Sequence, residues 1–286
     1  MKIPKTVQAD LALILVTMIW GSTFTIVKQA LAQVSPLLFI SLRFWVATLL
    51  TVVLMPGALR EISAQTLRRG SILALLLLGG FVFQTLGLRG TTPSRSAFIT
   101  SLSVPLVPVL GFFLFGHRPR RRTLAGVALA AVGLGFLTLE RLELSFTVGD
   151  TLTLLCAIFF ALHILFISRY LPTTDFRQLV ILQMAVSAVV STLANPVLET
   201  PFLVWDVPFT LYLFVTGVLA TALGFYVQNM AQQFTTANRT ALIFALEPIF
   251  AALYAYIVLG QTLTVKEGLG SGLVIAGILT SELRRG

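Results

Sequence analysis

The sequence predicts an all-α polytopic membrane protein, in which ten transmembrane helices form two inverted repeats of five. Three observations predict this class. The 286 residues are 57% hydrophobic and only 11% charged, whereas about a quarter of the residues in a soluble domain are charged. Charge-free apolar runs recur along the whole chain, and each bilayer span needs about 20 mostly apolar residues. The chain also contains one long stretch twice.

The repeated stretch covers residues 80–136, which align with residues 224–280 at a constant shift of 144 and without a gap. Thirteen of the 57 pairs are identical, and they include glycines, glutamines and an arginine. Chance is a poor explanation for such matches in a gapless register, so we interpret the stretch as an internal duplication. The two predicted repeats span 1–141 and 145–286 and together form one domain.

The ten helices follow from the apolar runs and from the turn residues between them. They are predicted at 10–29, 35–57, 70–89, 95–116, 122–139, 150–169, 177–198, 207–232, 238–259 and 266–282. With the N-terminus in the cytoplasm, fourteen lysines and arginines lie in cytoplasmic segments and five in segments on the other side. The positive-inside rule therefore places both termini in the cytoplasm.

The first two helices also align with the sixth and seventh, at a shift of 140. This register pairs Trp20 with Phe160 and Arg43 with Gln183. Each repeat has an odd number of helices, so the second repeat enters the membrane upside down relative to the first. Inverted repeats are common in transporters, where the substrate site lies near the midplane between the halves and rocking gives alternating access.

Several other classes of protein are excluded. The net charge of +9 comes from basic residues in the loops, where topology requires them, so no nucleic-acid partner is expected. The single Cys156 lies in an apolar run and provides neither a disulfide nor a metal-ligand pair. No GxSxG, HExxH or P-loop motif is present, and His117 and His163 are the only histidines, so we expect no enzyme, cofactor or metal.

Polar side chains inside the apolar runs are the site candidates, because burying them in hydrocarbon costs free energy unless they face a partner or a cavity. Gln84 and Gln228 are equivalent in the two repeats and favour a lined cavity over interhelical bonding, worth about 0.6–2 kcal/mol per bond. The predicted substrate-binding cavity is lined by Trp20, Thr23, Phe24, Phe83, Gln84, Ser101, Phe160, His163, Gln228, Asn229 and Phe244.

Three of the candidates have two or more interpretations. His163 is either a donor to substrate and proton carrier, or a neutral histidine bonded to a backbone carbonyl. Glu247, followed by Pro248, is a proton-coupling site, a counter-charge for a substrate amine, or the structural partner of a buried cation such as Arg43. Arg43 lies about 12 Å into its helix and has the alternative of snorkelling to the interface.

Four groups of residues form recognisable motifs: Trp20-Gly21-Ser22-Thr23-Phe24 with Lys28, Ser35-Pro36 with Leu42-Arg43-Phe44, Leu246-Glu247-Pro248-Ile249-Phe250, and Leu259-Gly260-Gln261 followed by Gly270, Leu273 and Gly277. With these motifs, nearly the whole chain resembles the EamA-like branch of the drug/metabolite transporter superfamily. Within this branch the chain resembles YddG-type exporters of aromatic and hydrophobic amino acids. The resemblance implies a ten-helix basket with a central cavity, in the bacterial inner membrane. Phe160 departs from the tryptophan that many such units carry.

The leading functional hypothesis is therefore export of amino acids and similar small metabolites by alternating access. The aromatic residues would pack the side chain of the substrate, and the amides and His163 would bind its head group. The alternatives are an exporter of cationic drugs or polyamines that uses Glu247, and a non-transporting scaffold or sensor. The expected partners are a small-molecule substrate and the lipid bilayer, and the expected state is a monomer. Passive and proton-coupled transport both remain open.

Overall fold

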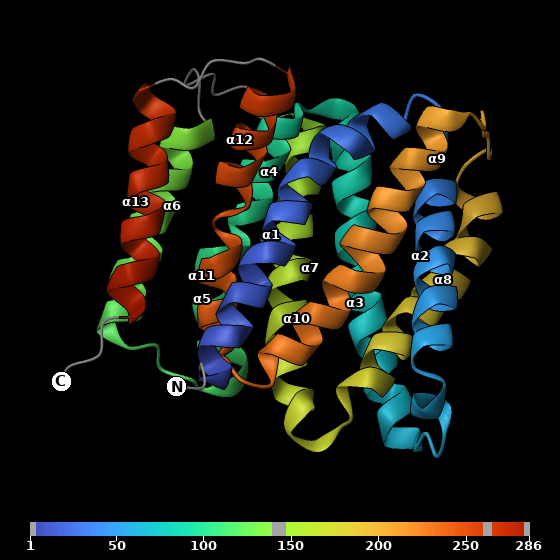
Figure 1. Ribbon diagram of the computed structural model, residues 1–286, viewed down its shortest axis with the longest axis horizontal. Helices are drawn as coiled ribbons and strands as arrows, with labels where there is room; N and C mark the ends of the chain where they lie inside the picture. The colour runs from blue at the N-terminus through green and yellow to red at the C-terminus, as the bar shows by residue number, and fades with distance from the viewer. Residues whose placement is uncertain (1–3, 139–146, 260–264, 283–286) are drawn as a thin grey trace.

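The computed structural model describes residues 4–138, 147–259 and 265–282. Within these ranges the regular structure is helical, apart from one isolated bridge between Val34 and Leu203. The helices stand side by side in one bundle (Figure 1). Seven helical segments in the described part are long and apolar enough to cross a bilayer, so the chain is a multi-pass membrane protein.

Each half is a succession of helices joined by short segments. The first half contains α1 (Lys5–Ala30), α2 (Pro36–Leu54), η1 (Pro56–Leu59), α3 (Ala64–Gly90), α4 (Pro93–Ser101), α5 (Ser103–Phe115) and α6 (Arg121–Thr138). The second half contains α7 (Val148–Tyr170), η2 (Leu171–Thr173), α8 (Phe176–Leu198), α9 (Val207–Leu213), η3 (Phe214–Leu223), α10 (Gly224–Gln232), α11 (Ala237–Phe244), α12 (Glu247–Leu259) and α13 (Val265–Glu282).

Three of the predicted helices are interrupted in the structure. The helices predicted at 95–116 and 238–259 are each broken in two, into α4 with α5 and α11 with α12. The helix predicted at 207–232 contains the π-helical segment η3 between α9 and α10. The apolar runs predicted a single helix at each of these places, with Pro248 expected only to kink its helix, and the difference matters because all three interruptions adjoin the cavity described below.

The first helices of the two halves run in opposite directions. Lys28, near the end of α1, donates to the carbonyl oxygen of Leu88, near the end of α3, so α1 and α3 run parallel. Arg69, near the start of α3, donates to Thr173 beyond the end of α7 (2.9 Å), so α3 and α7 run antiparallel. α1 and α7 are therefore antiparallel, as an inverted repeat requires (Figure 1).

Glycines bring helices from different halves into close contact. A Cβ atom on Gly133 of α6 would lie 2.6 Å from the carbonyl oxygen of Gly270 in α13. A Cβ on Gly277 of α13 would lie 2.5 Å from the carbonyl oxygen of Gly126. Both distances are shorter than any real side chain permits, so α6 and α13 pack backbone against backbone. Small residues are the usual means of close helix packing in membranes.

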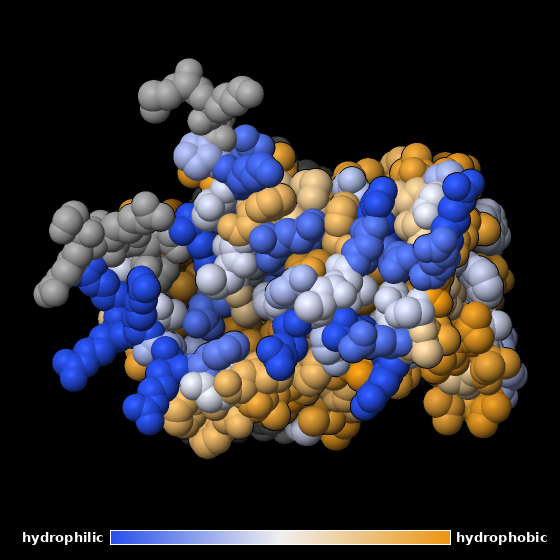
Figure 2. Space-filling view, turned by 90° about the horizontal axis from the view of Figure 1, so that it is seen from below, coloured by the Kyte–Doolittle hydropathy of each residue, from blue (hydrophilic) through white to orange (hydrophobic). Residues whose placement is uncertain are grey.

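The surface separates apolar flanks from a polar end. Large apolar side chains such as Leu49, Val53 and Phe113 are exposed along the bundle, as lipid contact requires. Figure 2 looks onto the face that carries the N-terminus, where hydrophilic side chains gather. We call this face the N-terminal face and the other the opposite face.

Candidate functional site

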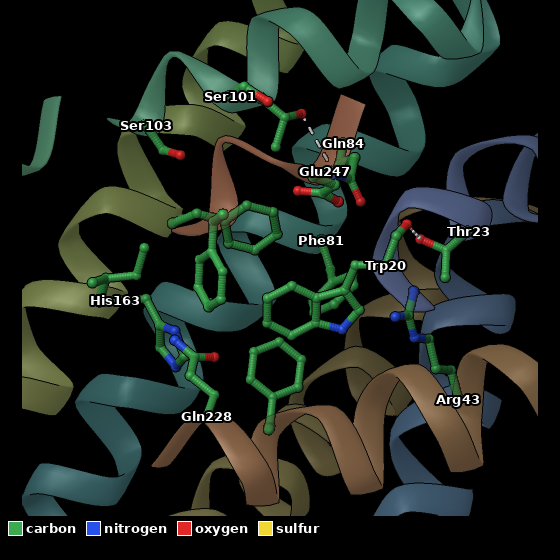
Figure 3. A pocket seen from close by; sticks show the side chains of 15 residues that line it. Trp20, Thr23, Arg43, Phe81, Gln84, Ser101, Ser103, His163, Gln228 and Glu247 are labelled. Carbon is green, nitrogen blue, oxygen red and sulfur yellow. Dashed lines mark hydrogen bonds between the residues drawn. The ribbon is translucent and has the colours of Figure 1, made fainter. Parts of the chain in front are cut away.

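A cavity lies inside the bundle between the two halves (Figure 3). It is lined by Trp20, Thr23, Arg43, Phe81, Gln84, Thr100, Ser101, Ser103, Phe160, His163, Ile164, Phe225, Gln228, Phe244 and Glu247. The centre of a water molecule can occupy about 60 Å³ of it. One water needs about 10–15 Å³ by this measure, so the cavity accommodates a few waters and must widen to take a larger molecule.

Aromatic rings form most of the apolar wall. The ring of Trp20 lies 5.2 Å from that of Phe225 and 5.0 Å from that of Phe244. The ring of Phe81 lies 5.5 Å from that of Phe160. These centroid distances suit edge-to-face and tilted packing, which holds each ring in place. The aromatic wall is therefore rigid, and a flat apolar group can pack against it.

The two helix breaks bring polar groups to the cavity. α4 ends at Ser101 and α5 starts at Ser103, whereas α11 ends at Phe244 and α12 starts at Glu247. Ser103 and Glu247 are equivalent in the two repeats. Pro248 follows Glu247 directly and cannot donate a backbone bond to the preceding turn, which favours a helix start at this point. Transporters commonly build their sites from helices that are broken in this way.

Two ionisable side chains of opposite charge line the cavity. Arg43 is only 3% exposed, its Nε donates to Thr221 Oγ1, and its guanidinium carbon lies 4.2 Å from the centre of the Phe81 ring. Glu247 enters from α12, in the first turn of that helix, where the positive end of the helix dipole favours a carboxylate. None of the ion pairs found in the described residues joins them.

This arrangement bears on one interpretation of each of Arg43 and Glu247. Arg43 is buried and bonded to a neighbouring helix, so it does not snorkel to the membrane surface. Glu247 forms no salt bridge with Arg43 among the described residues. A structural ion pair between these two residues therefore does not explain their burial. Both charged groups instead face the same cavity.

The π-helical segment η3 positions the bonds around Arg43 and Trp20. Thr221 Oγ1 donates to the carbonyl of Thr216, five residues earlier (2.7 Å), and at the same time accepts from Arg43. The indole nitrogen of Trp20 donates to the carbonyl of Ala220 (2.7 Å). A π-helical turn displaces carbonyl groups from the regular α-helical ladder, and such turns are frequent at functional sites.

The amide and imidazole groups form a second polar side. Gln84 Nε2 donates weakly to Thr100 Oγ1 (3.5 Å), and Gln228 Nε2 donates to Gln232 Oε1 (2.9 Å). The other amide atom of Gln228, Oε1, is buried without a partner among the described residues. An unpartnered buried acceptor costs free energy unless water or a ligand satisfies it, so this oxygen is available to a donor in the cavity.

His163 is held by a side chain. A carbonyl oxygen can only accept, so His163 Nε2 donates to Gln183 Oε1 (2.8 Å). The backbone-carbonyl partner considered from the sequence is therefore not the one found. Gln183 is the repeat equivalent of Arg43, and His163 that of Thr23. With Nε2 donating, Nδ1 of the neutral ring is left as an acceptor.

Ten of the sequence-predicted residues line the cavity and three do not. The ten are Trp20, Thr23, Arg43, Gln84, Ser101, Phe160, His163, Gln228, Phe244 and Glu247. Phe24 packs in a separate apolar cluster, Phe83 stacks against Phe159 (5.4 Å between ring centres), and Asn229 donates to the carbonyl of Phe225 (2.8 Å).

Five lining residues were missed by the sequence prediction: Phe81, Thr100, Ser103, Ile164 and Phe225. Phe81 and Phe225 are an identical pair in the repeat alignment and follow the identical glycines Gly80 and Gly224. Greater weight on identities between the halves would therefore have found these two aromatic residues. Nothing in the sequence distinguished Ile164 from the apolar residues around it.

A two-part helical bundle in the membrane, with a cavity at broken helices between its halves, defines a transport protein of the small-molecule type. The chain belongs to the EamA-like transporter family, whose model matches residues 7–139 and 147–282, once for each half.

Known proteins resemble the chain over nearly its whole length. An uncharacterized transporter of Archaeoglobus fulgidus is 33% identical over 98% of this chain and 87% of its own. A Salmonella typhimurium protein described as a probable amino-acid metabolite efflux pump is 26% identical over 93% of this chain and 91% of its own. A solved crystal structure, at 18% identity, superposes with a TM-score of 0.78 over 96% of each chain and shows the same fold.

Proposed function

We propose that the protein exports amino acids with aromatic or other hydrophobic side chains, and similar small metabolites, across the bacterial inner membrane by alternating access. In this proposal ten membrane-spanning units form two inverted repeats, and the protein acts as a monomer. The similarity to the Salmonella typhimurium protein supports the amino-acid class. The chemistry of the cavity supports it independently.

The observation that carries the proposal is the presence of one guanidinium and one carboxyl group that face a single aromatic cavity without pairing with each other. In Figure 3, Arg43 and Glu247 approach the cavity from different helices beside Trp20. A zwitterionic head group would place its carboxylate on Arg43 and its ammonium on Glu247. Gln228 Oε1, which lacks a donor among the described residues, would accept a further bond from the ammonium. The aromatic wall would pack the side chain.

The same cavity disfavours two other substrate classes. A phosphorylated substrate carries about two negative charges and would meet one guanidinium and one carboxylate. A cation without a carboxylate would be attracted by Glu247 and repelled by Arg43, and it would leave that guanidinium without a counter-charge. Export of cationic drugs or polyamines is therefore the second candidate. A scaffold or sensor would leave both buried charges without a role.

The orientation proposed for the protein places the N-terminal face in the cytoplasm. Exposed arginines from loops and from helix starts, among them Arg60, Arg68, Arg118 and Arg177, belong to this face. The gathering of hydrophilic residues in Figure 2 agrees with it. Because cytoplasmic loops carry the excess of Lys and Arg, the positive-inside rule supports this orientation.

Counterflow in proteoliposomes tests the proposal. Vesicles loaded with unlabelled phenylalanine should accumulate labelled phenylalanine faster than empty vesicles or vesicles without protein. External phenylalanine should compete, whereas phenethylamine, which lacks the carboxylate, and 3-phenylpropionate, which lacks the amine, should compete weakly. Phenethylamine competing as well as phenylalanine would favour the cation exporter. No counterflow with any member of a broad amino-acid panel would contradict the proposal.

Charge-neutralising variants refine the same assay. Glu247→Gln and Arg43→Gln should each reduce counterflow at least about thirtyfold, because loss of one partner of a buried charge contact costs about 2–5 kcal/mol. Glu61→Gln and Arg89→Gln change exposed residues and serve as controls. Glu247→Gln with unchanged phenylalanine transport would remove that residue from the head-group site.

A further inference from the structure

Two ion pairs in the bundle are formed by equivalent residues of the two repeats. Arg95 Nη2 lies 2.9 Å from Asp150 Oδ2 and joins the start of α4 to the start of α7. Arg239 bonds to Asp10 through two atoms and joins the start of α11 to α1. The shift of 140 maps Asp10 onto Asp150, and the shift of 144 maps Arg95 onto Arg239. Each pair therefore links the first helix of one repeat to the broken helix of the other.

The two pairs lie on opposite sides of the central cavity. Asp10 is ten residues before Trp20, and Asp150 is ten residues before the equivalent Phe160. At 1.5 Å per residue, each aspartate lies about 15 Å along its helix from the aromatic wall. The arginines are five residues, or about 8 Å, from the lining residues at the helix breaks. Because α1 and α7 run in opposite directions, one pair lies toward each face (Figure 1).

The pair toward the N-terminal face adjoins a second cavity. The centre of a water molecule can occupy about 420 Å³ of this cavity. Its lining includes the stretch 235–238 directly before Arg239, and also Leu165 and Ser168 of α7. Ile164, next to Leu165, lines the central cavity instead. Helices α7 and α11 thus contribute side chains to both cavities, and the start of α11 lies at the second one.

We propose that these ion pairs are the two latches of the transport cycle, each of which closes one end of the central cavity and breaks when that end opens. Asp10–Arg239 is the inner latch, toward the N-terminal face, and Arg95–Asp150 is the outer latch. The structure has both latches formed, which corresponds to an occluded state. The proposal rests on the proposed transport function for its physiological meaning, but access to the cavity can be measured without a substrate.

The two latches are not equally strong. Asp150 is fully buried and also accepts bonds from Thr91 Oγ1 (2.8 Å) and from the backbone nitrogen of Thr147 (2.9 Å). The side chain of Asp10 is 15% exposed. Thr235 is the repeat equivalent of Thr91, and its hydroxyl is buried without a partner among the described residues. The outer latch should therefore hold more tightly, so that the inner end opens more often at rest.

Thiol accessibility tests the latches directly. Cys156, the only cysteine of the chain, is replaced by alanine, and Ser103→Cys places a reporter in the central cavity. A membrane-impermeant thiol reagent is then applied to either face of oriented vesicles. Asp10→Asn should speed labelling from the N-terminal face about two- to fivefold, as expected for a partly exposed pair. Asp150→Asn should speed labelling from the opposite face at least about tenfold, because the carboxylate of Asp150 is fully buried whereas that of Asp10 is not.

A matched control and a charge reversal separate a latch from a purely structural contact. Asp175 pairs with Arg177 within one turn of α8 and joins no two helices, so Asp175→Asn should leave labelling unchanged. Reversing the inner latch, Asp10→Arg with Arg239→Asp, should restore the slow labelling that either single change removes. Arg95→Gln replaces Asp150→Asn if the latter does not elute as a folded peak in gel filtration.

Two results would overturn the latch proposal. One is unchanged labelling in folded variants of both pairs, and the other is faster labelling from the same face in both. Neither labelling result would contradict the proposed function, because counterflow of phenylalanine is measured in a separate assay. Conversely, absent counterflow together with face-specific labelling would reject the substrate and keep the latches.

Discussion

Gly80 of α3 lies against the ring of Phe160 in α7, and its repeat equivalent Gly224 of α10 lies against the ring of Trp20 in α1. A Cβ atom on Gly80 would meet the Phe160 ring at 2.3 Å, and one on Gly224 would meet the indole nitrogen of Trp20 at 2.9 Å. The same contact is thus made on both sides of the cavity. The charges are different, because Glu247 corresponds to Ser103 in the other repeat. The comparison teaches that the two repeats share their packing and differ in their chemistry.

The backbone shows the same contrast. α3 is α-helical from Ala64 to Gly90, whereas its counterpart in the second repeat contains the π-helical segment η3. In η3 the hydroxyl of Thr221 and the carbonyl of Ala220 bond to side chains of α2 and α1. The irregular backbone thus occurs where η3 of the second repeat bonds to Arg43 of the first. The repeat equivalent of Arg43 is Gln183, which within the described residues bonds to His163 and not to α3.

Giving the two charged positions of the cavity the residues of their repeat equivalents should have the largest effect. Arg43→Gln with Glu247→Ser gives each position the residue of its repeat equivalent. If the charges define the site, the double variant should lose phenylalanine counterflow by about a thousandfold, since two lost contacts at about 2 kcal/mol each sum to about 4 kcal/mol. Thermal unfolding should not show a comparable loss, because buried charges stabilise little relative to neutral groups. Transport at half the original rate would show that the shared scaffold is sufficient.

A methyl group at Gly21 should have the next largest effect. A Cβ there would lie 2.8 Å from the carbonyl oxygen of Glu247 and 2.9 Å from the nitrogen of Ala251, both backbone atoms. Gly21→Ala should therefore push α1 from the start of α12 and destabilise the protein by about 1–3 kcal/mol, as overpacking does. The equivalent position in the second repeat is Ala161, which already carries the methyl group.

Thermal unfolding in detergent measures this change, and counterflow measures its consequence for the site. Gly57→Ala is the control, because no atom lies within 4 Å of its Cβ position. Equal unfolding temperatures for the Gly21 and Gly57 variants would show that α1 and α12 separate without cost. The site would then be less dependent on this contact than the distances indicate.

Sequence reasoning predicted the helical class, the approximate helix ranges and the duplication, because apolar composition and repeat identity are local properties of the chain. It also predicted many cavity residues, since a polar side chain in an apolar run needs a partner. It misplaced Phe24, Phe83 and Asn229, because in a helix that is apolar on all sides the pattern does not reveal which face turns inward. It missed the helix breaks and η3, which depend on bonds to other helices.

The smallest expected effect concerns the one polar atom by which Trp20 differs from Phe160. The indole N–H of Trp20 bonds to the carbonyl of Ala220 (2.7 Å), and a phenylalanine cannot make this bond. Trp20→Phe keeps an aromatic wall and should cost about 1 kcal/mol, the usual net worth of a hydrogen bond, so counterflow should fall only about fivefold. Trp20→Leu is the comparison variant and should fall further, because it also removes the ring. A loss with Trp20→Phe as large as with Glu247→Gln would mean that the indole holds η3, and with it Arg43, in place.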